Sequence, residues 1–69
     1  MPLSLAKAGD VSCIKQLTGN DKTRRHLEDL GLVVGSDIMI VAEMAGNIIV
    51  NIKGSRLAID KSLANNILI

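Results

Sequence analysis

This 69-residue chain contains few side chains suited to metal or acid–base chemistry: one histidine, one cysteine, three methionines and seven acidic residues. His26 and Asp29 stand three positions apart and would share a helical face. Ferrous iron would need at least a third donor, as in the two-histidine-one-carboxylate arrangement. His26 also falls beside the apolar stripe of the expected helix, so we predict that it is solvated. The sequence therefore predicts no metal site. Association with Fe2+ is possible, but no set of ligands in the sequence supports it.

The sulfur-containing side chains are expected to pack rather than react. Cys13 falls in an apolar segment, where cysteine commonly behaves as a small buried hydrophobe. Met39 and Met44 flank an otherwise core-like strand, which favours packing over soft-metal binding. A single cysteine allows no disulfide within the chain, and one Cys with one His disfavours a four-ligand zinc site.

Catalytic constellations are missing from the sequence. One histidine and scattered acids build neither a Ser-His-Asp set nor a pair of catalytic carboxylates. Neither pair of glycines is followed by the Lys-Ser/Thr of a phosphate-binding loop. We therefore predict a protein that is not an enzyme and requires no cofactor.

The composition narrows the choice of binding partner. Phe, Trp and Tyr are absent, which argues against base stacking and against aromatic-lined grooves for proline motifs. The net charge is only +1, and acids dilute the one basic cluster, formed by Lys22, Arg24 and Arg25, so nucleic acid is not expected. No apolar run approaches the roughly 20 residues of a membrane span, and the N-terminal residues lack the basic region and long apolar core expected of a signal peptide. We expect a cytoplasmic protein that does not insert into membranes.

Turn residues and apolar periodicity predict one mainly β domain over residues 1–69 with one or two short helices. Ser4 is expected to begin a helical turn that ends at Gly9, and Asn20 and Asp60 to cap the two helices. The expected helices cover 21–30 and 61–65, and the five expected strands cover 11–17, 37–43, 48–52, 56–59 and 66–69. Five short strands with tight turns suggest a small curled barrel, whose closure would remove exposed sheet edges.

The segment from Arg25 to Asp37 is the most informative part of the chain. Leu27 and Leu30 would lie on the buried face of the helix, and Gly31 would end it in a left-handed conformation. Two oppositely charged pairs four residues apart are expected on the solvent side: Arg24 with Glu28, and Arg25 with Asp29.

Four short sequence motifs, spread in order over essentially the whole chain, resemble the ferrous iron transport protein A (FeoA) family. They are Ser4-Leu5 with Gly9, Arg25-x-Leu27-x-x-Leu30-Gly31-Leu32-x-x-Gly35, Gly54 with Ala58-Ile59, and Ala64 with Ile67. The chain departs from the family at Val34 and near Asn47, where members often carry proline. Related domains occur at the C-termini of iron-dependent transcriptional repressors.

The resemblance implies an SH3-like β-barrel and an accessory role beside a membrane ferrous-iron transporter with a cytosolic GTPase domain. The alternative is an SH3-like regulatory or transition-metal-binding domain of the iron-dependent repressor type. We expect no DNA-reading helices before Met1, which favours the accessory protein. Direct iron carriage is a third hypothesis, which a loss of Fe2+ binding in His26→Ala or Cys13→Ala would support.

A partner surface is expected on the helix from Lys22 onward and on the loop that follows it. There a short charged face adjoins an apolar loop, and apolar patches with polar rims mark partner sites. The candidate interface residues are Lys22, Arg25, His26, Asp29, Leu32, Val33 and Val34. So apolar a chain could also self-associate weakly.

Overall fold

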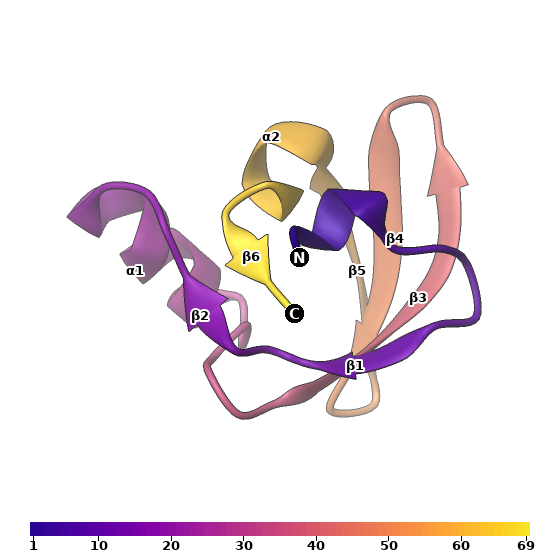
Figure 1. The fold of residues 1–69 in the computed structure, drawn as a ribbon, viewed down its shortest axis with the longest axis horizontal. Coiled ribbons are helices and arrows are strands. Elements are labelled where there is room, and N and C mark those ends of the chain that lie inside the picture. Colours follow the sequence, from indigo (N-terminus) through magenta and orange to yellow (C-terminus); the bar gives the residue numbers. More distant parts are fainter.

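The computed structural model describes residues 1–69 and is mainly β, as the sequence predicts (Figure 1). Two α-helices and one 3₁₀ helix accompany six short strands. In chain order the elements are η1 (Leu3–Leu5), β1 (Val11–Cys13), β2 (Gln16–Leu17), α1 (Asp21–Asp29), β3 (Asp37–Met44), β4 (Asn47–Ile52), β5 (Ser55–Asp60), α2 (Lys61–Ala64) and β6 (Ile67–Leu68).

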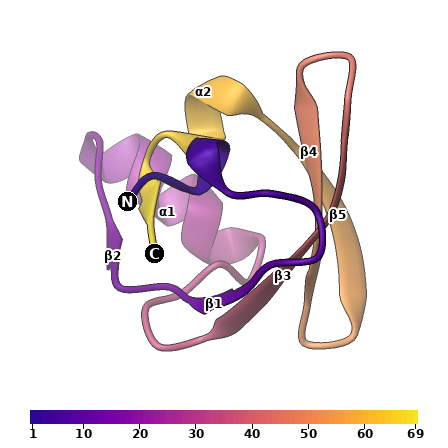
Figure 2. The same cartoon turned by 45° about the vertical axis from the view of Figure 1, so that its right-hand side comes forward.

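The strands form two antiparallel sheets instead of one closed barrel. Four strands pair in the order β1-β3-β4-β5, and β2 pairs separately with β6. The register between β3 and β4 shifts between Ile40 and Ala42, which leaves Val41 as the extra residue of a bulge. Figure 2 shows the long β3–β4 hairpin on one side of the molecule, with α1 and β2 on the other. The expected closed barrel is therefore wrong, because no strand pairs with the outer edge of β5.

The single strand expected over residues 11–17 is also wrong, because it divides into β1 and β2. Between them Ile14 donates its N–H to the carbonyl of Ser36 at 2.9 Å, and Lys15 donates to the carbonyl of Leu68 at 2.7 Å. The backbone thus leaves the partner β3 and joins β6. Ile14 and Leu17, three positions apart, are both buried, a spacing that one regular strand cannot place on one face.

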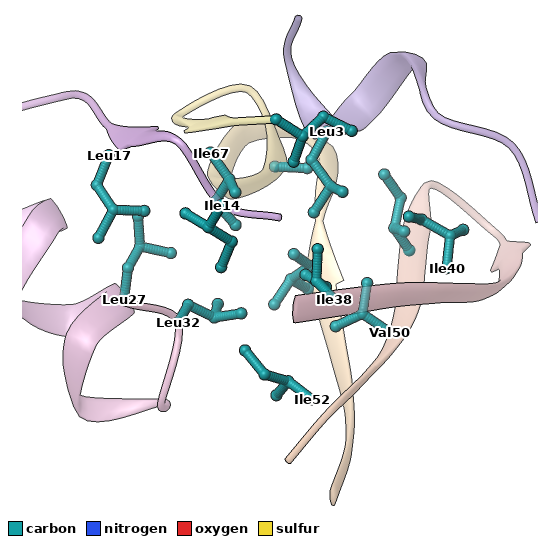
Figure 3. Close-up of a cluster of buried hydrophobic side chains, with 14 residues drawn as sticks. Leu3, Ile14, Leu17, Leu27, Leu32, Ile38, Ile40, Val50, Ile52 and Ile67 are labelled. Carbon is teal, nitrogen blue, oxygen red and sulfur yellow. The ribbon is translucent and has the colours of Figure 1, made fainter. Parts of the chain in front are cut away.

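Fourteen apolar side chains from all parts of the chain form one core without a buried polar residue (Figure 3). They are Leu3, Ile14, Leu17, Leu27, Leu32, Ile38, Ile40, Ile48, Val50, Ile52, Ile59, Ala64, Ile67 and Ile69. Branched aliphatic residues dominate because the chain has no aromatic residue to fill the volume. The core holds α1 and its exit loop against the strands.

Three side chains differ from their predicted surroundings. Cys13 is exposed, because the outward face of β1 carries Val11 and Cys13 while Ser12 points the other way. Met44 is 61% exposed next to the β3–β4 turn, so it does not pack in the core. Ser4 does not cap a helix; its hydroxyl donates to the side-chain oxygen of Asn65, and η1 begins after Pro2 without a side-chain cap.

Candidate functional site

An open cleft of about 440 Å³ lies between α1 and β2 and is the candidate interaction site. Most of its wall is polar. The eight residues that line it are Lys15, Gln16, Leu17, Asp21, Arg24, Arg25, Glu28 and Val34. They come from three neighbouring segments between residues 15 and 34: Lys15 with β2, the helix α1, and the loop after it.

The helix wall of the cleft is fixed by an N-cap and by one apolar face. The side-chain oxygen of Asn20 accepts the N–H of Thr23 at 2.8 Å, as the sequence predicts for a helix that starts at Asp21. Leu27 is fully buried and Leu30 is half-buried. With this face held against the core, the charged residues on the side of α1 toward β2 line the cleft.

The end of α1 is a Schellman motif, which turns the chain toward β3. Gly31, with φ +91°, donates its N–H to the carbonyl of Glu28 at 2.9 Å. Leu32 donates to the carbonyl of Leu27 at 3.0 Å, and both leucine side chains are 0% exposed. Leu32 is therefore a core residue, and its predicted role as an interface residue is wrong.

Val34 reaches the cleft because the loop around it is tied to the segment between β1 and β2. Gly35 donates its N–H to the carbonyl of Ile14 at 2.8 Å, and Ile14 donates to the carbonyl of Ser36 at 2.9 Å. Val34 is left 59% exposed on the cleft wall, where Lys15 also lies. An apolar side chain thus stands within a charged rim.

The charges of the cleft are only partly neutralised within the chain. Arg24 forms an ion pair with Asp21, one turn earlier on α1. Neither predicted pair, Arg24 with Glu28 or Arg25 with Asp29, is formed. Lys15, Arg25 and Glu28 form no ion pair, so the cleft presents two cations and one carboxylate together with an exposed valine.

The predicted interface residues differ in whether they line the cleft and in how exposed they are. Arg25 and Val34 line the cleft. Lys22, His26 and Asp29 are exposed on α1 but lie outside the cleft wall, and His26 is solvated as predicted. Val33 is half-buried.

Six residues that line the cleft were not among the predicted interface residues. Asp21, Arg24 and Glu28 recur at spacings of three and four, which would have marked one helical face. Lys15, Gln16 and Leu17 carried no such signal: β2 precedes α1 by only three residues, and no local pattern marks its pairing with distant β6.

Neither a group of metal ligands nor a helix that could span a membrane is found in this structure. No three His, Cys, Asp or Glu side chains come close enough together to hold a metal ion. The longer α-helix has nine residues, and neither helix has the length and apolar character needed to cross a bilayer.

Comparison with known proteins identifies the family. The family model of the FeoA domain matches residues 1–69. The chain belongs to the FeoA family. A protein of Methanocaldococcus jannaschii named Fe(2+) transport protein A is 29% identical over 68 residues, which cover 99% of this chain and 83% of the relative. The crystal structure of an iron uptake regulatory protein, FeoA, superposes on this FeoA-domain protein with a TM-score of 0.89 at 35% identity, covering 96% of this chain and 88% of that one.

The fold is shared more widely than the family. The structure of a manganese-dependent transcriptional repressor in complex with manganese has a TM-score of 0.91 at 21% identity. It aligns with 97% of the FeoA-domain protein, which spans 34% of the repressor. The predicted FeoA resemblance and SH3-like architecture are confirmed, with the barrel open. Family membership supports a role in Fe2+ transport.

Proposed function

We propose that this protein is a non-enzymatic, cytosolic accessory protein of ferrous iron uptake. It binds the cytosolic GTPase domain of a membrane ferrous-iron transporter, and the cleft between α1 and β2 is its docking face. The observation that supports this face most directly is the pair of unpartnered cations, Lys15 and Arg25, beside the exposed side chain of Val34. Iron remains with the transporter in this proposal.

The chemistry of the cleft defines the partner segment. A carboxylate of the partner would pair with Lys15 or Arg25, and an aliphatic side chain next to it would cover Val34. Because the cations are on an open surface, they speed association and orient the partner more than they add affinity. The cap and the Schellman motif hold α1 in place before binding, which reduces the ordering cost of the complex.

A titration of ¹⁵N-labelled protein with the GTPase domain, in its GDP-bound and GTP-analogue-bound states, tests the proposal. Amide shifts are expected at Lys15–Leu17, along α1 and at Val34. Arg25→Glu is expected to weaken binding about tenfold, a change of roughly 1.4 kcal/mol. Lys22→Glu is the matched control, since it makes the same charge reversal on the same helix outside the cleft.

Equal loss of affinity in both variants would refute the cleft and point to general charge attraction. Unshifted amides in every nucleotide state would remove the GTPase domain as the partner. The repressor-type regulatory alternative is favoured here only by the shared fold, since less than 25% of the residues are identical.

A further inference from the structure

The outer edge of β5 is the longest regular sheet edge left without a partner strand. β5 pairs with β4 over six consecutive residue pairs, from Asn47 with Asp60 to Ile52 with Ser55, with no bulge. It is the last strand of the order β1-β3-β4-β5, and it lies at the margin of the sheet (Figure 2). It contains no proline to block pairing. Proteins usually shorten, bend or cover such edges because they template association with another chain.

The hairpin geometry decides which backbone groups face outward. The turn between β4 and β5 has two residues, Lys53 and Gly54, with φ values of 51° and 79°, as in a type I′ turn. Ile52 and Ser55 therefore form a hydrogen-bonded pair, and hydrogen bonding to β4 alternates from there. The N–H and C=O groups of Arg56 and Ala58 consequently point to the free edge, and no turn or loop residue bonds to them.

The outward side chains of β5 are self-complementary in charge. Arg56, Ala58 and Asp60 share the exposed face, while Leu57 and Ile59 point toward the core. In an antiparallel pairing of two β5 strands with Ala58 opposite Ala58 on the two-fold axis, Arg56 of each copy lies opposite Asp60 of the other. Ala58, which lies on this axis, is one of the two residues whose backbone N–H and C=O groups point to the free edge.

Both charged side chains are available for such a contact. Arg56 forms no ion pair within the chain. One carboxylate oxygen of Asp60 accepts the N–H of Leu63 at 2.8 Å, which leaves its second oxygen free. Leu57 is only half-buried and would lie opposite Ile59 of the second copy on the core side.

We propose that this chain forms a symmetric dimer through antiparallel pairing of β5 with β5 of a second copy. The register has Ala58 on the two-fold axis and two reciprocal Arg56–Asp60 pairs. The two four-stranded sheets become one continuous eight-stranded sheet. This surface is separate from the cleft between α1 and β2, so the dimer leaves both clefts open.

Sedimentation equilibrium of the full chain over micromolar to millimolar concentrations tests the proposal. Wild type is expected to approach twice the monomer mass, with a dissociation constant that rises with salt. R56E and D60R are each expected to raise that constant about tenfold or more, because each replaces two attractive cross-strand contacts with repulsive ones. K7E, at an exposed position outside β5, is the control and should behave as wild type.

A mixture of R56E and D60R provides the decisive measurement. In the mixed dimer both cross-strand pairs are again of opposite charge, so an equimolar mixture should recover dimerisation. This recovery separates the interface from a folding defect, such as loss of the α2 cap in D60R. A wild-type chain that stays monomeric at millimolar concentration overturns the proposal, and so does a mixture that stays monomeric. Amide shifts of β5 with the GTPase domain but not with a second copy would assign the edge to a different partner.

Discussion

Leu32 and Val34 are two positions apart in one loop, and their substitution by alanine should affect different properties, the stability of the fold and the binding of the partner. Leu32 is fully buried against the core beside Leu27, whereas Val34 is 59% exposed on the cleft wall. Leu32→Ala is expected to destabilise the fold, and Val34→Ala to weaken docking while leaving the fold intact.

The size of the first effect follows from burial. A fully buried leucine truncated to alanine costs about 2–5 kcal/mol, because transfer free energy is lost and a cavity remains. At roughly 0.05–0.15 kcal/mol per residue, a 69-residue domain is stable by only about 3–10 kcal/mol. A loss of about 3 kcal/mol would lower Tm by roughly 12–24 °C. Val34→Ala, at an exposed position, should change stability by about 0.5 kcal/mol or less.

Urea unfolding followed by circular dichroism measures both stabilities, and the titration with the GTPase domain measures binding. A Leu32→Ala variant within 1 kcal/mol of wild type would refute the burial of this side chain in the core. A Val34→Ala variant that is destabilised by more than 1 kcal/mol, or that binds the GTPase domain as well as wild type does, would refute the place of Val34 on the docking face.

Three further predictions follow from other features. Asn20→Ala should cost about 1 kcal/mol by removing the cap of α1, while Asn20→Asp should keep the cap and stability, measured by urea unfolding. Gly31→Ala should cost about 1–2 kcal/mol in the same assay through its positive φ alone, because an added Cβ meets nothing within 4 Å. Cys13 should react fully with a thiol reagent in native buffer, since it is exposed.

A specific outcome would contradict each of these three predictions. An Asn20→Asp variant as unstable as Asn20→Ala would show that the side chain does not act as a cap. A loss well above 2 kcal/mol in Gly31→Ala would indicate a steric clash that the structure does not contain. A thiol that reacts only in urea would place Cys13 in the interior, as its apolar sequence neighbours first suggested.

Local interactions account for the parts of the fold that were predicted correctly. The helix over 21–29, its Asn20 cap, its end at Gly31 and the Asp60 cap of α2 each depend on residues within about five positions. The β3–β4–β5 meander is local as well, because tight turns set its register. Its strands were therefore placed to within two residues.

The errors lie where distant segments meet. The sequence between Val11 and Leu17 has enough β-branched and apolar residues for one strand, and only the competing partners β3 and β6 divide it. Cys13 looked buried because its neighbours are apolar, but β1 is an edge strand that presents this side to solvent. The exposure of a β residue depends on what covers its face.

By itself the sequence determined the family, the mainly β class, the short helices and their caps, because these features depend on residue types at fixed short spacings. The tertiary structure alone decided that Leu32 belongs to the core, that Lys15 and Arg25 line one cleft, and that β5 ends the sheet with a free edge. The physical reason is that exposure and proximity depend on pairings between distant segments, such as β2 with β6, whose partners no local pattern specifies.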